Sequence, residues 1–299
     1  MTILPSALPI ILLLSACQSK EHPDENVPMA GKVSPSDSIL TTSWLPRYDL
    51  NEKNPPTLTV SNKLNEISGL AMSADGRLFA HDDEDPVVYV LSYTTGEVLK
   101  RFTVGSGFME EDFEGIAVKN DTLFLVTSSG DIFAFQETGD REHTDFQLYG
   151  TFLSEKNDVE GLEYDPLTDC LLLACKGDPG KGYGGYKAVY AFSLKDRVLQ
   201  KEPRFLVPLK NAGGKKHKDF NPSGIALHPE AGTFFILSAD GGLIMEIDRN
   251  GIILGEEEIP VDTNSQPEGI AFAPDGTMLI ANDGQGGKGT VTAYPAESP

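Results

Sequence analysis

The hydrophobic positions of this chain lie in short runs of about four to eight residues, separated by Gly, Asp, Asn and Pro. Examples are GRLFAHDD and VVYVLSY in the first half, and PEGIAFA and TMLIAND near the end. Many of the apolar residues are β-branched or aromatic, which favours strands over helices. The pattern therefore predicts an all-β protein built from many short strands.

One short motif recurs five times, as ISGLA, FEGIA, VEGLE, PSGIA and PEGIA. Its glycines are Gly69, Gly115, Gly161, Gly224 and Gly269, so successive copies lie 46, 46, 63 and 45 residues apart. A unit of about 45 residues with four strands matches one blade of a β-propeller. We therefore expect a five-bladed β-propeller of four-stranded blades. Six blades are the alternative, because the residues before the first motif could hold a further strand or two.

The last unit contains only three predicted strands before the chain stops. The segment Thr57–Leu64 precedes the first motif in the position of an outer strand, but it has no blade of its own. We expect this N-terminal strand to complete the last blade and so close the ring, which removes the exposed sheet edges of an open array.

Within the motif, Gly and Ala alternate with larger residues, so one face of each innermost strand is small. Gly115 and Ala117 share such a face, and Gly269 and Ala271 share another. Neighbouring blades converge at the axis, which explains this preference. The third copy departs from it with Glu163, and we expect a local polar contact there.

The N-terminus carries a separate signal. The stretch ALPIILLLSAC is too short to span a bilayer and fits the core of a signal peptide. Its end, LSAC, resembles the bacterial lipoprotein cleavage box, which implies cleavage before Cys17 and lipidation of that residue. A plain secretory signal remains the alternative. We expect a lipoprotein signal peptide at 1–16, a flexible Pro- and Ser-containing tether at 17–43, and the propeller domain at 44–299.

These features predict a protein of the bacterial cell envelope, attached to a membrane by its lipid anchor. Gln18 after the cysteine favours the outer membrane over the inner one. The formal net charge of −21 makes nucleic acid an unexpected partner, since phosphate contacts need a basic surface. Cys170 and Cys175 lie on one predicted strand with an odd spacing, so we expect two unpaired, buried thiols. We also expect the protein to be a monomer.

Carboxylates stand directly before several innermost strands. In a propeller this position lies at one mouth of the central channel, which would bring together Glu66, Glu114, Glu160 and Glu268. Glu66 is offset, because two residues separate it from Gly69, and Ser68 could take its place; the fourth blade supplies Ser223. Loops after the second strands open on the same mouth and add further acids, among them Asp82, Asp83 and Asp283.

Such a ring repels itself, since two charges 4 Å apart cost about 4 kcal/mol at an effective dielectric constant of 20. It must take protons, bind a cation or pair with donors. All-oxygen ligands favour a hard cation, and Ca²⁺ suits a loose cage better than Mg²⁺. We predict metal ligands among Glu66, Glu114, Glu160, Glu268, Asp82 and Asp283. The alternative is that each Glu caps backbone N–H groups and no metal binds.

Several sequence motifs resemble the SdiA-regulated family of bacterial envelope proteins, a distant relative of the NHL-repeat propellers. These motifs are YDL, LNEISGLA, DFEGIAV, DVEGLEYD, NPSGIALHP and QPEGIAFAPDG. The resemblance covers about Leu45 to Tyr294. It implies a five-bladed propeller with a calcium ion near the channel. Ser223 departs from the Glu pattern and argues against a fully symmetric ring.

Two functions fit these observations. The first is a non-enzymatic binding or scaffold protein whose calcium-occupied acidic mouth meets a protein or small-molecule ligand. The second is a calcium-dependent esterase, lactonase or phosphoesterase acting at the channel, in which the ion polarises the substrate. A hydrolase also needs a base within reach. His81 beside Asp82 is a candidate base, although a hydrogen-bonded histidine at a strand end is the competing interpretation.

Overall fold

The computed structural model describes residues 42–297 except 108, 110 and 211–219. The described residues belong to one compact unit, Ser34–Pro299. The predicted signal peptide, Cys17 and almost all of the tether lie outside the described residues, so those predictions stay open. Within the described part of the chain, no helix is both long and apolar enough to cross a membrane.

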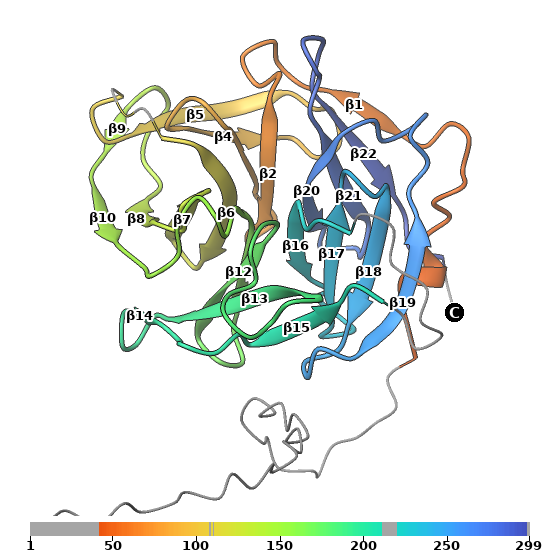
Figure 1. Cartoon of the computed structure of the whole chain (residues 1–299). Coiled ribbons are helices and arrows are strands. Elements are labelled where there is room, and N and C mark those ends of the chain that lie inside the picture. The colour runs from red at the N-terminus through yellow and green to blue at the C-terminus, as the bar shows by residue number, and fades with distance from the viewer. Residues whose placement is uncertain (1–41, 108, 110, 211–219, 298–299) are drawn as a thin grey trace, which may run out of the picture. The chain divides into compact units, whose positions relative to one another are not determined.

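Five mainly antiparallel sheets surround a central axis, which confirms the five-bladed propeller (Figure 1). Blade one contains β2 (Ile67–Met72), β3 (Leu78–Asp82), β4 (Val87–Leu91) and β5 (Val98–Val104). Blade two contains β6 (Phe113–Lys119), β7 (Thr122–Thr127), β8 (Ile132–Gln136) and β10 (Phe146–Tyr149). Blade three contains β11 (Val159–Asp165), β12 (Cys170–Cys175) and β13 (Tyr186–Ser193), and both β14 (Val198–Leu199) and β15 (Phe205–Pro208) pair with β13. Blade four contains β16 (Gly224–Leu227), β17 (Phe234–Ser238), β18 (Leu243–Ile247) and β19 (Ile253–Glu258).

Blade five joins both ends of the domain. Its strands β20 (Pro267–Phe272), β21 (Met278–Asn282) and β22 (Thr290–Tyr294) are completed by β1 (Thr57–Thr59). The register of β1 against β22 pairs Thr57 with Thr292 and Thr59 with Thr290. The N-terminal strand therefore closes the ring, as the missing fourth strand predicted.

The repeated glycines are required by the close approach of the innermost strands. A Cβ on Gly115 would lie 2.8 Å from Leu162 N, and one on Gly269 would lie 2.9 Å from Leu70 N. No side chain fits at these distances. At the exceptional Glu163, the carboxylate accepts hydrogen bonds from Leu227 N of blade four (3.1 Å) and from Tyr164 N (2.7 Å), which is the polar contact expected there.

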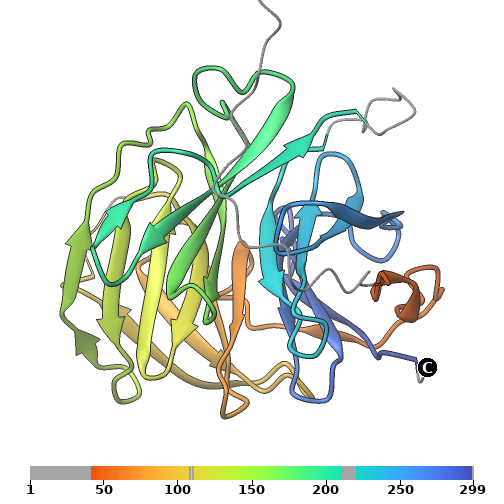
Figure 2. The ribbon, with the colours of Figure 1, turned by 90° about the horizontal axis from the view of Figure 1, so that it is seen from below.

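The hydrophobic core lies between neighbouring blades, and the segment before β1 fills one of these spaces. Leu45, Tyr48 and Leu50 are buried among residues of blades four and five. The buried carboxylate of Glu246 accepts hydrogen bonds from Ser43 Oγ (2.6 Å) and Trp44 N (2.7 Å). Figure 2 shows the short 3₁₀ helix η1 (Leu45–Arg47) beside the C-terminal end of the domain.

Two further details bear on the sites below. Cys170 and Cys175 are free and buried, as predicted. In addition, a short strand β9 (His143–Thr144) from the connection between β8 and β10 pairs in parallel with β5 of blade one. This fifth strand was not predicted from the sequence.

Candidate functional site

A β-bulge places one side chain of an innermost strand at the channel in four of the five blades. The register of the first two strands shifts between Ile67 and Gly69, Phe113 and Gly115, Val159 and Gly161, and Pro267 and Gly269. The extra residue of a bulge is left out of the ladder and its side chain is redirected. These extra residues are Ser68, Glu114, Glu160 and Glu268, which we call the channel ring.

The channel ring surrounds a very small space. The four residues and the neighbouring motif glycines line a cavity of about 10 Å³. That volume holds about one water molecule. Ser223 of blade four is 2 % exposed, and its Oγ donates to Pro267 O at 2.7 Å. The channel is therefore closed by side chains at this level and offers no room for a substrate.

Internal partners relieve the repulsion within the ring. Lys176 Nζ lies 2.9 Å from Glu160 Oε1, Gln266 Nε2 donates to Glu268 Oε1 at 2.7 Å, and Ser68 Oγ donates to Glu114 Oε2 at 3.2 Å. Among the described residues, Lys176 is the ring's ion-pair partner.

Protonation relieves the remaining repulsion. Burial, followed by the charges of Glu160 and Asp112, raises the pKa of Glu114 to about 9. Burial and then the charge of Glu160 raise the pKa of Glu268 to about 7. Burial lowers the pKa of Lys176, but its bond to Glu160 outweighs this effect and the net shift is upward. At neutral pH, Glu114 therefore keeps its proton and Lys176 keeps its charge.

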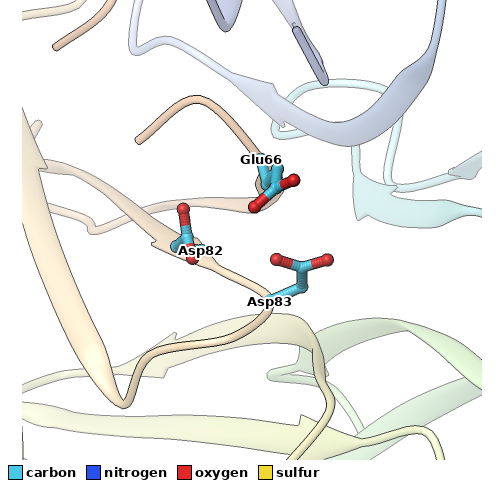
Figure 3. A group of neighbouring side chains, drawn as sticks. All are labelled: Glu66, Asp82 and Asp83. Carbon is cyan, nitrogen blue, oxygen red and sulfur yellow. The ribbon is translucent and has the colours of Figure 1, made fainter. Parts of the chain in front are cut away.

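A second group of carboxylates lies apart from this ring. Glu66, just before β2, Asp82, the last residue of β3, and Asp83 each place one ligand atom within 4.8 Å of those of the other two (Figure 3). The pairing of Ile67 with Asp82 brings the two segments together. We call these residues the acidic trio. Among the described residues, they are the one group of three potential metal ligands at such mutual distances.

The trio lacks the internal neutralisation of the ring. Burial, then the charges of neighbouring acids including Glu66, raises the pKa of Asp82 and of Asp83 to about 6. None of the ion pairs between described residues involves the trio. Asp83 Oδ1 is buried without a hydrogen-bond partner, and so is Asn65 Oδ1 in the residue before Glu66. Three carboxylates with an unpartnered buried oxygen fit a hard cation such as Ca²⁺, which binds oxygen ligands.

The six predicted ligands therefore divide between two places. Glu114, Glu160 and Glu268 meet at the channel, whereas Glu66 and Asp82 meet with Asp83. Ser68, not Glu66, occupies the ring position of blade one. Asp283 joins neither group: its Oδ1 accepts from Gln285 N at 2.7 Å, although its charge contributes to the raised pKa of Glu268.

His81 does not reach the mouth of the channel. It is fully buried, its Nδ1 lies 3.2 Å from Asp82 O, and its Nε2 has no partner in the described structure. A Cβ on Gly69 would lie 2.5 Å from Nε2, so the His81 imidazole packs against the innermost strand of its blade. Burial lowers the pKa of His81 to about 4, and it is neutral at pH 7.

Sequence reasoning missed Lys176, and it placed Asp83 at the mouth without including it among the predicted ligands. Both directly follow the second strand of their blades, so their positions are equivalent. An alignment of the repeats by the residue after each second strand gives Asp83, Ser128, Lys176, Ala239 and Asp283. This alignment could have identified both positions from the sequence, because it shows one basic residue among acids and small residues.

Comparisons with known proteins agree with the fold. The family model described as SdiA-regulated matches residues 41–285. No curated protein matches the chain. Among solved structures, Myxococcus xanthus glutaminyl cyclase is 15 % identical with a TM-score of 0.53, over 81 % of this chain and 94 % of that one. A luciferin-regenerating enzyme is 11 % identical with a TM-score of 0.53, over 81 % and 96 %. A Bacteroides thetaiotaomicron protein of unknown function is 16 % identical with a TM-score of 0.51, over 75 % of this chain and 58 % of that one. At these identities the likeness concerns the fold alone.

Proposed function

The chain belongs to the SdiA-regulated family, and from this premise we propose that it is a calcium-binding β-propeller of the bacterial cell envelope that binds a partner without catalysing a reaction. The acidic trio is the observation that carries the proposal. Its carboxylates converge, their charges are uncompensated by the basic side chains described, and Asp83 Oδ1 is buried without a partner.

A calcium ion would be held by Glu66, Asp82 and Asp83, with Asn65 Oδ1 as a further candidate ligand. The bound ion supplies positive charge, which compensates the carboxylates. These residues join the start of β2 to the end of β3, so their neutralisation stabilises the mouth of blade one. Glu66 is exposed, and a partner that offers an oxygen ligand could reach the site from solvent.

Two observations favour binding over hydrolysis. The channel cavity of about 10 Å³ has no room for an ester or a lactone. The base considered from the sequence, His81, is fully buried and faces Gly69. A calcium-dependent esterase, lactonase or phosphoesterase needs a base within reach of the substrate, and His81 does not provide one.

The location belongs to the same proposal. The LSAC motif supports lipidation of Cys17, and residues 17–43 would then connect the lipid to a domain that is packed from Ser43 onwards. We propose attachment to the outer membrane and a monomeric domain. Its partner is a protein or small molecule that meets the acidic mouth.

Calcium titration of the Ser34–Pro299 domain tests this function. We expect one Ca²⁺ per chain by calorimetry, and a gain of about 2.7 kcal/mol in unfolding free energy when free Ca²⁺ is 100 times its Kd. Asp83→Asn should remove both effects, because it deletes a ligand charge. Asp121→Asn, an exposed aspartate in the β6–β7 turn, is the matched control and should retain them.

Two results would contradict the proposal. One is a wild-type domain whose stability and heat of mixing do not respond to calcium. The other is chelator-sensitive hydrolysis of a lactone, an aryl ester or a phosphate ester by the purified domain, which would replace the binding role with an enzymatic one.

A further inference from the structure

A basic groove lies on the outer side of blade one, and the charges of Asp82 and Asp85 reach Tyr89 in its lining. It has a volume of about 320 Å³, and its lining includes Lys63, Tyr89, Leu99, Arg101, Asp140 and Arg141. These residues come from three parts of the chain: the segment after β1, the strands β4 and β5, and the loop before β9. The groove is therefore formed only when the ring is closed and β9 has paired with β5.

Specific contacts fix the lining of the groove. Asp140 Oδ1 accepts from Arg101 N at 3.1 Å, and Arg141 N donates to Arg101 O at 2.6 Å, so the loop of blade two is held against β5. Arg141 has a φ of 60°, a left-handed conformation that non-glycine residues rarely adopt without support. Tyr89, which pairs with Arg101 across β4 and β5, donates from its Oη to Lys63 O at 2.8 Å and so holds the segment after β1.

The groove carries a local surplus of positive charge. Of the basic side chains Lys63, Arg101 and Arg141, only Arg141 forms an ion pair with the lining carboxylate of Asp140 (3.5 Å), which leaves a surplus of two positive charges. Lys100 also lines the groove but forms an ion pair with Glu137. Among the described residues, no carboxylate forms an ion pair with Lys63 or Arg101. In a chain with a net charge of −21, such a surplus is a local exception.

We infer that this groove binds a phosphate monoester. Such a group carries a charge of about −1.5 to −2 at pH 7, which matches the surplus. The planar guanidinium of arginine can donate two parallel hydrogen bonds to phosphate oxygens. Leu99 is 63 % exposed at the groove, so the ester's organic part meets an apolar side chain. The ester can be a free metabolite or a lipid headgroup.

Binding of two probes to the Ser34–Pro299 domain tests the inference and separates the sources. Glycerol 3-phosphate, followed by NMR or calorimetry, represents the free ester. Vesicles containing phosphatidic acid, compared with pure phosphatidylcholine vesicles in co-sedimentation, represent the lipid. Saturable binding of either phosphate probe supports the groove, and the probe that binds more tightly identifies the source.

Variants connect the binding to the groove. Arg101→Gln should weaken binding at least about tenfold, because a hydrogen-bonded ion pair is lost. Lys195→Gln changes the net charge equally at an exposed turn in blade three and should leave the affinity unchanged. If Arg101→Gln does not fold, the exposed Lys63→Gln provides the same test.

Several outcomes would overturn the inference. These are the absence of saturable binding of both phosphate probes, an equal loss of affinity in Lys195→Gln, and acetate binding as tightly as glycerol 3-phosphate. None of them bears on calcium, so failure here is distinguishable from failure of the proposed function.

Discussion

Blade one and blade three carry acidic groups at the same mouth of the propeller but neutralise them differently. In blade three, Lys176 follows the second strand and lies 2.9 Å from Glu160. In blade one, Asp83 occupies the equivalent position and adds its charge to those of Asp82 and Glu66. The backbone register is the same in both blades, with a bulge before the motif glycine. The residue after the second strand therefore distinguishes the blade with an internal ion pair from the blade at which we propose a cation.

The largest expected effect comes from removing the positive charge of Lys176 in blade three. Lys176→Gln leaves the carboxylate of Glu160, which is 7 % exposed, without its partner. We expect a loss of about 3 kcal/mol in the free energy of unfolding at pH 8, measured by urea denaturation. Solvent partly screens the ion pair, since the Lys176 side chain is 34 % exposed. The expected loss of stability therefore lies at the low end of the range for a broken buried ion pair.

The pH dependence of this loss provides the control. Glu160 has a raised pKa in the folded state, and without Lys176 that pKa rises further. The penalty should therefore be largest at high pH and should shrink as the pH falls and Glu160 takes a proton. A double variant with Glu160→Gln should recover most of the loss, whereas equal losses at pH 5 and pH 8 would contradict this account.

Acidification should weaken calcium binding at blade one. Burial and the neighbouring acids raise the pKa of Asp82 and of Asp83 to about 6 in the metal-free protein, so protons compete with the cation below that pH. We expect the Kd for Ca²⁺ to rise about tenfold between pH 7.5 and pH 5.5, measured by calorimetry. A Kd that is constant across this range would show that these two carboxylates are not ligands.

A smaller effect is expected from the ring residue of blade five. Burial and the charge of Glu160 raise the pKa of Glu268 to about 7 in the folded state, above its unfolded value. The folded protein thus binds the extra proton, and stability should fall as the pH rises from about 5 to 8. Glu268→Gln should remove about 1 kcal/mol of this decline, a discounted value because Glu268 is only partly buried. Urea denaturation at a series of pH values in excess calcium measures it, and an unchanged slope would argue against the raised pKa.

The fold could be predicted because its signals repeat. Five glycine-led motifs at nearly regular spacing define the innermost strands, and Gly115 and Gly269 are required by the close approach of the neighbouring strand, whereas Gly69 makes room for the His81 side chain. Closure followed from counting strands, since blade five lacked one and Thr57–Leu64 had no other place. The strand β9 could not be predicted in this way, because it has two residues and its parallel pairing with β5 depends on tertiary contacts.

The candidate site could be predicted only in part. The sequence places acids before the innermost strands, but a bulge decides which residue faces the channel, and in blade one that residue is Ser68. Glu66 is two positions earlier and turns to Asp82 and Asp83 instead. The sequence also predicted that the ring must take protons, bind a cation or pair with donors. Choosing between these outcomes required the position of Lys176, a side chain in the loop that follows β12.

The most direct measurement locates the cation. Crystals of the Ser34–Pro299 domain, soaked with a lanthanide that substitutes for Ca²⁺ at oxygen ligands, would give an anomalous difference map. We predict a single strong peak among the carboxylates of Glu66, Asp82 and Asp83, and no peak between Glu114, Glu160 and Glu268. A peak within the channel ring and none at the trio would contradict the account, because it would show that Lys176 and protons do not neutralise the ring.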